Sequence, residues 1–382
     1  MLVPTSLCPP APAAPPKFFV GLDTHKDTIV AAVLGADAAT PEPAITLPTT
    51  GPALARFVQR LLARGPAVAC YEASGGGYVL QRQLTAWGLP CVVVAPGLVP
   101  VRPGHQRKHD RADAAQLALQ YRAGALTPVR VPTPADERVR DLVRCRQQLQ
   151  RALLRARHQL RTFLVRRGFV YRRVAWTQAH GDWLSQVLRT LPPQDYLVAS
   201  EYRAHAEYLQ ARRTELDRLL AAVAATPALA PAVQRLQCFR GLDVLAALGL
   251  HVELVDWQRF TTPTQLMAFW GLVPREASSG ATARRGGLTK AGSAWCRHLL
   301  VQAAWSYRHP PRVRPALLAR QAGQPAAVVA HAWKAQQRLH ALYRRLRQRR
   351  GAQIAVVAVA RELVGFLWAV MQDVPAPAHG VA

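Results

Sequence analysis

Two apolar runs rich in β-branched residues, FFVGLD (18–23) and TIVAAVLG (28–35), are separated only by the four residues THKD. A hairpin of two strands fits so short a connection. Helical patterns at 51–65 and 78–88 then alternate with apolar strands at 67–74 and 89–96, and a helix from about 110 to 122 follows. This order predicts an α/β domain over residues 17–130.

An antiparallel hairpin followed by alternating helices and strands is the element order expected of an RNase H-like core. The preceding residues 1–16, MLVPTSLCPPAPAAPP, form a Pro- and Ala-rich tail that we expect to be disordered. This tail lacks the basic start and continuous apolar core of a signal peptide.

A heptad pattern marks the next region. Over residues 135–168, seven of the eight residues at two alternating heptad positions are apolar, namely Val139, Leu153 and Leu160 at one, with Arg146 as the exception, and Leu142, Leu149, Ala156 and Phe163 at the other. Residues 198–224 repeat this apolar heptad pattern, which we call the seam. The pattern predicts two long helices that pair as an antiparallel coiled-coil arm within residues 131–232.

The rest of the chain reads as mainly helical. Residues 233–350 form a further unit, in which a polar loop, SSGATARRGGLTKAG (278–292), precedes a helix that begins near residue 293. Residues 351–382 form a C-terminal helix and tail. The apolar stretch 354–371 contains Arg361 and Glu362, which favours a packed helix over a membrane span.

The charge of the chain points to a polyanionic partner. Lys and Arg number 49 against 22 Asp and Glu, a formal net charge of +27. Such an excess predicts nucleic-acid binding that weakens strongly with salt. The six cysteines contain no C-x-x-C pair, which is typical of free thiols in a reducing compartment. We take the candidate nucleic-acid-binding residues to be Lys108, Arg111, Arg144, Arg151, Arg155, Arg284, Arg285 and Lys290.

Acidic residues are scarce near the N-terminus, and four of them stand out. Asp23 and Glu72 each end an apolar strand, and Asp110 and Asp113 share one face of a helical turn. Four converging carboxylates repel one another unless cations neutralise them. Mg²⁺ prefers oxygen ligands, and two such ions assist phosphodiester displacement. The alternative is structural: Asp110 and Asp113 favour a helix start, and Asp23 or Glu72 pairs with an arginine.

Several segments together resemble the DEDD transposases of the insertion-sequence-110 family, which are related to Piv-type DNA invertases. The segments include GLDTHKD (21–27), CYEASGGGY (70–78), VAPGLVPVRPGHQRKHDRADAAQLA (94–118), GLVPREASSG (271–280) and GGLTKAG (286–292). The resemblance spans about residues 17–370. It implies a RuvC-like N-terminal domain, a coiled-coil arm and a C-terminal transposase domain, with the family carboxylates at Asp23, Glu72, Asp110 and Asp113.

The same resemblance implies a serine nucleophile within Ser278-Ser279-Gly280, and we take Ser279. It further implies guidance by a structured noncoding RNA of the same element, and a tetramer acting on donor and target DNA. The chain departs from the family pattern at His109, where Thr or Asn is usual, and at Ser293, where Asn is usual.

A serine hydroxyl needs activation by a base or a metal, and no His/Asp triad spacing surrounds Ser279. Activation would therefore come from the carboxylate site, with Arg284, Arg285 and Lys290 binding the phosphate. Read without the family, a Ser-Gly pair in a polar loop is usually a turn.

The sequence thus predicts an RNA-guided DNA recombinase of an insertion sequence, acting in the bacterial cytoplasm at the nucleoid. It would use Mg²⁺, in two sites, with Mn²⁺ as a substitute. Two alternatives stay open: a RuvC-like metal-dependent nuclease with water as nucleophile, and a nucleic-acid-binding relic or regulator without activity.

Overall fold

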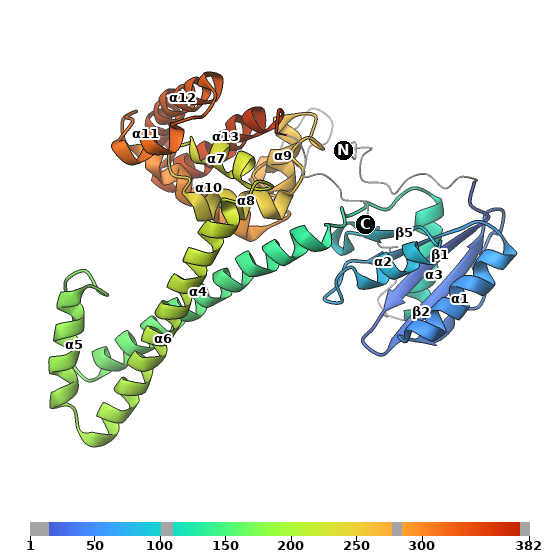
Figure 1. The fold of residues 1–382 in the computed structure, drawn as a ribbon, viewed down its shortest axis with the longest axis horizontal. Helices are drawn as coiled ribbons and strands as arrows, with labels where there is room; N and C mark the ends of the chain where they lie inside the picture. The colour runs from blue at the N-terminus through green and yellow to red at the C-terminus, as the bar shows by residue number, and fades with distance from the viewer. Residues whose placement is uncertain (1–14, 101–109, 277–284, 375–382) are drawn as a thin grey trace. The chain divides into compact units, whose positions relative to one another are not determined.

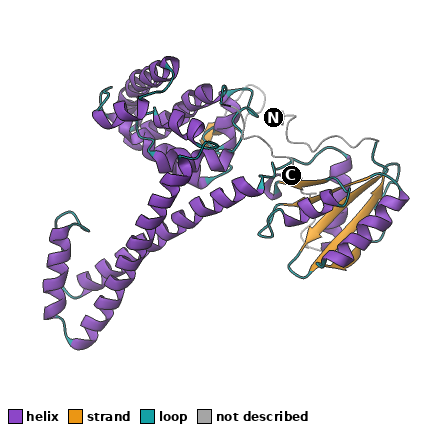
Figure 2. Ribbon diagram, in the orientation of Figure 1, coloured by secondary structure: helices purple, strands orange, loops and turns teal. Residues whose placement is uncertain are grey.

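The computed structural model describes residues 15–100, 110–276 and 285–374 of the 382-residue chain. The chain divides into two compact units, Met1–Val131 and Pro132–Ala382. Figure 2 shows that the large sheet belongs to the first unit, whereas the second is almost entirely helical. The finer division at residues 17, 131, 233 and 351 stays a prediction. Most of the predicted N-terminal tail, and the last eight residues, lie outside the described residues.

A five-stranded mixed sheet forms the centre of the first unit, in the order β3-β2-β1-β4-β5. The strands are β1 (Phe18–Thr24), β2 (Thr28–Gly35), β3 (Ile45–Pro48), β4 (Ala67–Glu72) and β5 (Cys91–Val94). The first two strands form the predicted antiparallel hairpin, and β4 and β5 continue the sheet parallel to β1. This arrangement is consistent with an RNase H-like domain. The edge strand β3 was not predicted, because its four residues are mostly exposed and carry no apolar alternation.

Helices cover both faces of this sheet (Figure 1). Helices α1 (Gly51–Arg64) and α2 (Val79–Ala86) pack on one face, where Val20, Leu22 and Tyr71 share a buried cluster with Leu54, Val58 and Leu84. Helix α3 (Asp110–Arg122) packs on the opposite face, and a short 3-10 turn, η2 (Pro96–Leu98), follows β5.

Two long antiparallel helices, α4 (Pro134–Arg166) and α6 (Pro193–Ala224), begin the second unit. Thr133 starts α4 with a capping box, because its hydroxyl accepts from the Asp136 backbone N–H and the Asp136 carboxylate accepts from the Thr133 N–H. Three pairs of side chains bridge the helices, namely Arg146 with Asp217, Gln150 with Arg213, and Arg157 with Gln210. The residue numbers rise along α4 as those of their partners fall along α6, so the helices are antiparallel. The predicted antiparallel pair is therefore present, while its coiled-coil character stays a prediction.

The interface of this pair is only partly the predicted seam. Leu153, Ala156, Leu160 and Phe163 are buried as expected. The polar exception, Arg146, lies in the interface as well, because its guanidinium binds both carboxylate oxygens of Asp217 at 2.5 and 3.1 Å. Helix α5 (Gln178–Thr190) joins the pair near the end of α4 and was not predicted.

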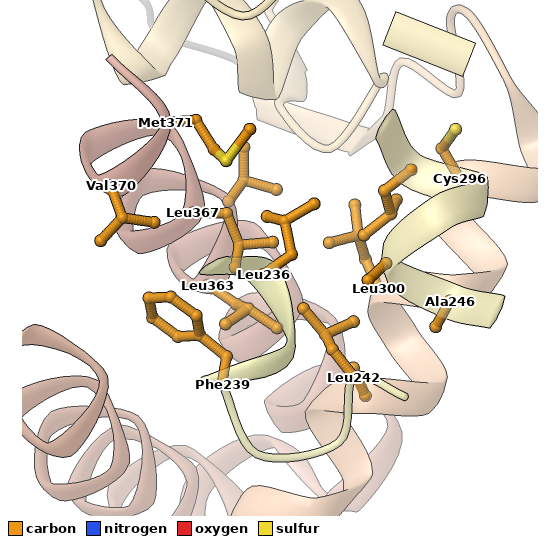
Figure 3. Close-up of a cluster of buried hydrophobic side chains, with 14 of the residues drawn as sticks. Leu236, Phe239, Leu242, Ala246, Cys296, Leu300, Leu363, Leu367, Val370 and Met371 are labelled. Atoms are coloured by element: carbon orange, nitrogen blue, oxygen red, sulfur yellow. The ribbon is translucent and has the colours of Figure 1, made fainter. Parts of the chain in front are cut away.

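The remaining helices enclose the largest apolar core. Figure 3 shows side chains of α7, α8, α10 and α13 meeting there, among them Leu236, Leu300 and Leu363. Helix α13 is apolar and long enough by composition to cross a membrane, but it lies in this core, with nine of its residues buried. The elements are α7 (Ala230–Gln237), α8 (Val244–Leu254), α9 (Pro263–Phe269), α10 (Ala294–Ala304), η3 (Trp305–Arg308), α11 (Pro315–Gln321), α12 (Ala326–Arg350) and α13 (Ala352–Met371).

Of the cysteines within the described part of the chain, Cys70, Cys91, Cys238 and Cys296 are buried free thiols, as expected, and Cys145 is exposed. Burial raises the pKa of the Cys238 thiol to about 11, so it stays protonated at neutral pH. These thiols are therefore packing groups.

Candidate active site

Two of the predicted carboxylates end neighbouring parallel strands. The register pairs Leu22 of β1 with Tyr71 of β4, so the next residues, Asp23 and Glu72, lie level at the carboxyl ends of the two strands. Neighbouring strands are about 4.8 Å apart, and paired residues point to the same face of the sheet. The sheet therefore holds these two side chains side by side.

The face to which they point is the one covered by α3. Side chains two residues apart in a strand share a face. Cys70, two residues before Glu72, has its sulfur 3.7 Å from the Leu117 carbonyl of α3. Gly21, two residues before Asp23, touches the same helix, since a Cβ there would lie 2.1 Å from the Ala114 carbonyl oxygen. Only glycine permits so close an approach of helix and strand.

This close approach brings the other two carboxylates to the strand ends. Asp110 and Asp113 lie in the first turn of α3. They belong to the stripe that continues through Ala114 and Leu117, which are buried against the sheet. Acidic residues in the first turn also favour the positive end of the helix dipole, so the structural alternative accounts for part of this placement.

A three-residue cluster joins strand and helix. The His25 Nε2 atom lies 3.3 Å from an Asp23 carboxylate oxygen and 3.2 Å from an Asp110 carboxylate oxygen. One ligand atom from each of Asp23, His25 and Asp110 lies within 4.8 Å of the others. The histidine follows Asp23 by two residues in the turn between β1 and β2, a signal too weak for sequence reasoning to have given it a role.

The donor set of this cluster suits a hard divalent cation. Carboxylate oxygens predominate, which favours Mg²⁺ or Mn²⁺ over the softer metals that thiolates and several imidazoles select. The Asp23 side chain is 21% exposed and that of Asp110 51%, so the site opens to solvent on the helix side. Two carboxylates this close repel each other, and a cation between them would remove that cost. The residues therefore fit a metal site.

A cavity of about 610 Å³ borders this cluster. His25 and Lys26 line one side and residues 74–77, Ser-Gly-Gly-Gly, line another. The Tyr71 hydroxyl donates to the Gly77 carbonyl at 3.1 Å and anchors this glycine-rich loop directly after the strand that carries Glu72. Leu54 of α1 and Leu80 of α2 also line this cavity, so it lies on the α1/α2 side of the sheet, and His25 is the member of the cluster that borders it.

The predicted nucleophile, Ser279, lies outside the described residues, as do Ser278, Lys108 and Arg284. Residues 277–284 follow β6 (Pro274–Glu276) and precede β7 (Arg285–Leu288), which pair antiparallel. Gly271 and Gly292 both have positive φ, and a Cβ on Gly292 would lie 2.2 Å from the Phe269 carbonyl oxygen. Tight packing thus fixes the base of this hairpin, where Lys290 is exposed.

Ser293, where the sequence departs from the resembling family, is the N-cap of α10 and accepts from the Cys296 backbone N–H at 3.3 Å. Asparagine caps helices equally well, so this departure keeps the local structure.

The other predicted nucleic-acid-binding residues differ in their surroundings. Arg111, Arg151 and Arg155 are exposed. Arg144 instead forms a bidentate pair with Glu253 of α8, at 2.8 and 2.9 Å, which connects α4 to the helical core. Arg144 and Arg151 also line a cavity of about 490 Å³ beside the start of α10. The guanidinium of Arg144 therefore has a structural role, and its contact with nucleic acid stays a prediction.

Two family profiles match the chain. The first, described as a transposase of the DEDD type found in IS110, covers residues 20–167. The second, described as the transposase IS116/IS110/IS902 family, covers residues 233–317. The first match thus contains all four carboxylates, Asp23, Glu72, Asp110 and Asp113, and the second contains strands β6 and β7.

Individual relatives agree with these profiles. A putative transposase, y4qE, of Sinorhizobium fredii is 40% identical over 305 residues, which cover 80% of this chain and 75% of the relative. The transposase for insertion sequence element IS1533 of Leptospira borgpetersenii is 31% identical over 348 residues, covering 87% and 98% of the two chains. A probable family 20 transposase of Pseudomonas aeruginosa is 28% identical over 312 residues, covering 80% and 84%.

Proposed function

Because the chain belongs to the IS110 family of DEDD transposases, we propose that it cuts and rejoins DNA through a covalent bond between Ser279 and a DNA phosphate. The observation that carries the proposal is the cluster of Asp23, His25 and Asp110 at the strand ends. We assign Glu72, at the neighbouring strand end, and Asp113, in the first turn of α3, to the same site. Its substrate is DNA, as the family implies.

We assign the first unit a RuvC-like fold, in which Asp23, Glu72, Asp110 and Asp113 would hold Mg²⁺ in two sites. The ions, when bound, would supply charge to the attacked phosphate and lower the pKa of the attacking hydroxyl. The chain's own contribution is rigid placement. The register of β1 and β4 would fix the backbones of Asp23 and Glu72, and the contact of α3 with Gly21 those of Asp110 and Asp113.

In the proposed step the Ser279 Oγ forms a bond to phosphorus, and the bond from phosphorus to one strand's bridging oxygen breaks. The hydroxyl proton passes to a base, and the leaving oxygen takes up a proton. A DNA hydroxyl reverses the step to rejoin strands, and no external energy source is needed because the ester conserves the bond energy. Arg284, Arg285 and Lys290 would bind the phosphate and offset its charge.

We further propose that a structured noncoding RNA of the same element guides the protein, that it works as a tetramer or dimer, and that it acts on nucleoid DNA in the cytoplasm. The positive charge supports binding of both nucleic acids, since 37 of the 49 Lys and Arg lie in residues 132–382, against 15 acids.

The test is a denaturing gel of purified protein incubated with element-end DNA, the flanking noncoding RNA and Mg²⁺, with and without protease. Wild type should form a protease-sensitive protein–DNA adduct. Ser279→Ala and Asp23→Asn should both abolish it, and so should omission of the divalent cation. Two control variants should leave the adduct unchanged. Ser278→Ala alters the serine next to Ser279, and Asp37→Asn alters an exposed acid in the same unit as Asp23.

Three results would contradict the proposal. Free cleaved DNA that persists in Ser279→Ala would identify a hydrolytic nuclease with water as nucleophile. An adduct that is lost in Ser278→Ala and kept in Ser279→Ala would identify Ser278 as the nucleophile. DNA binding without cleavage under every condition, unaffected by Asp23→Asn, would indicate a binding protein without activity.

A further inference from the structure

A cavity of about 450 Å³ lies where α4, α5 and the connecting residues 167–177 meet. Figure 1 shows α5 beside the end of the α4–α6 pair, away from the helical core of the same unit. A cavity of this size is typical of small-ligand sites. None of the proposed catalytic or nucleic-acid-binding residues lines it.

Aromatic rings form much of its wall. Tyr171 lies 5.0 Å from Trp183 and 4.7 Å from His180, and Trp176 lies 5.1 Å from His180, measured between ring centroids. Tyr171, Trp176 and Trp183 are only half-buried, so each ring keeps an accessible part. Phe163, in the adjacent cluster, is by contrast only 4% exposed.

The polar part of the wall is cationic. Arg157 lies over the Trp176 ring at 4.4 Å and donates to the Gln210 side chain at 2.8 Å, so its guanidinium is fixed. His158, Arg161, Arg172 and Arg173 are exposed at the rim, and no aspartate or glutamate is among the lining residues. Burial, and then the neighbouring Arg213, lower the pKa of Arg157. A bound anion would relieve this concentration of positive charge.

The backbone at Trp176 is strained. Its φ of +66° lies in the left-handed region, which costs a bulky residue energy that a glycine would avoid. The next residue, Thr177, caps α5 and accepts from the His180 backbone N–H at 3.3 Å. The cap and the stacked arginine hold the indole at the cavity in spite of this cost, which favours a function for the ring itself.

From these three observations we propose that the cavity binds an unpaired nucleotide, with its base stacked against Trp176 and Tyr171 and its phosphates at Arg172 and Arg173. Stacking on aromatic rings beside arginines is the general chemistry by which proteins bind single-stranded nucleic acid. A base within a duplex presents no free face and could not enter. The ligand is thus a single-stranded segment, of DNA or of RNA.

Full-length protein should be irradiated with oligonucleotides of about 16 nucleotides that carry 5-iodouracil, in single-stranded DNA, single-stranded RNA and duplex forms. We expect cross-links from the single strands, mapped by mass spectrometry to Tyr171, Trp176 or Trp183, and none there from the duplex. Comparison of the DNA and RNA arms identifies the source of the unpaired nucleotide.

Binding of the same probes should be measured by fluorescence anisotropy on matched variants. Trp176→Ala should weaken single-strand binding about tenfold, the loss of one stacked base, and should change duplex binding by less than about twofold. Trp333→Ala, at an exposed tryptophan of α12 outside the cavity, should weaken neither. Trp176→Phe should restore most of the affinity.

The rim arginines provide a second test that does not disturb the strained position. Arg172→Ala with Arg173→Ala should lower single-strand affinity more than duplex affinity, whereas the exposed pair Arg344→Ala with Arg345→Ala should lower both alike. The proposal fails if the wild-type cross-links avoid the cavity, or if the two double variants behave identically. It also fails if Trp176→Ala changes only the oligomeric state in sedimentation, since the cavity would then contact another protein chain. If Trp176→Ala does not fold, the cross-links and the comparison of the two double arginine variants still test the proposal.

Discussion

The two units of this transposase differ in where they keep their charge. Residues 1–131 contain 12 Lys and Arg and seven Asp and Glu, whereas residues 132–382 contain 37 and 15. In the first unit, four of the seven acids are Asp23 and Glu72, at two strand ends, and Asp110 and Asp113, in the first turn of α3. In the second unit several acids form ion pairs, as Glu253 does with Arg144 and Asp217 with Arg146. Under the proposed function, the first unit would supply carboxylates for the chemistry, and the excess of arginines in the second would bind nucleic acid.

The units also fix their polar groups by different means. The first uses direct backbone contact, at Gly21, to bring a helix start against strand ends. The second uses side-chain bridges along α4 and α6, which set the register of two long helices. Backbone contact tolerates almost no added volume, while side-chain bridges tolerate the loss of single members. Four predictions test this contrast, from the largest effect to the smallest.

The largest effect should come from the acidic site. Asp110→Asn should lower the rate of DNA strand cutting by about 100- to 1,000-fold, because it removes charge that the phosphate chemistry requires. Its thermal unfolding should stay close to that of wild type, since the Asp110 side chain is half exposed. Glu42→Gln, at an acid paired with Arg64 in the same unit, should cut at the wild-type rate. Equal losses in the two variants would break the distinction between site and surface acids.

Gly21→Ala should disturb both stability and chemistry. The added Cβ meets the backbone of Ala114 and Ala118, which cannot move without displacing α3. We expect a loss of about 3 kcal/mol in the free energy of unfolding, measured by urea denaturation, together with slower strand cutting. Gly35→Ala, in the neighbouring strand, meets its nearest atom only at 3.4 Å and should be nearly neutral. If both variants are equally stable, backbone contact does not place α3.

The bridge between α4 and α6 should show a smaller cost. Asp217→Ala removes the partner of Arg146, whose side chain is 16% exposed, and should lower the free energy of unfolding by about 2 kcal/mol. Strand cutting per folded molecule should not change. Glu215→Ala, in an exposed pair with Arg218, should have no measurable effect in the same denaturation series. A larger loss for Glu215→Ala than for Asp217→Ala would reverse the proposed ranking.

The smallest effect concerns pH. Burial, followed by Arg157 and Arg203, lowers the pKa of His180, so the folded state binds a proton there less readily than the unfolded state. The stability that neutral His180 provides is present above its unfolded pKa, about 6.5, and is lost as the pH falls below it. Denaturation at pH 7.5 and 5.5 should show a smaller pH dependence in His180→Gln than in wild type. If the difference in stability between the two pH values is the same in His180→Gln as in wild type, His180 does not contribute to the pH dependence.

Much of the first unit was predictable because its signals are local. The runs at 18–23 and 28–35, the glycines at 65 and 88 that end helices, and the acids at strand ends all follow from short-range pattern. Strand β3 and helix α5 were missed for different reasons. Strand β3 is short and mostly exposed, so it carries no apolar period of its own. Helix α5 does have an apolar face, with Leu184, Val187 and Leu188 buried, so its pattern was sufficient to predict it.

The sequence by itself determined the family, the α/β order of residues 17–130, the two long helices and the scarcity of acids that singles out the four carboxylates. These are properties of residue type and spacing. The tertiary structure alone decided that His25 bridges Asp23 and Asp110, that Arg144 pairs with Glu253, and that Trp176 meets Arg157 over a cavity. Each of these contacts depends on where whole elements pack, because a few ångströms of helix position decide which side chains can touch.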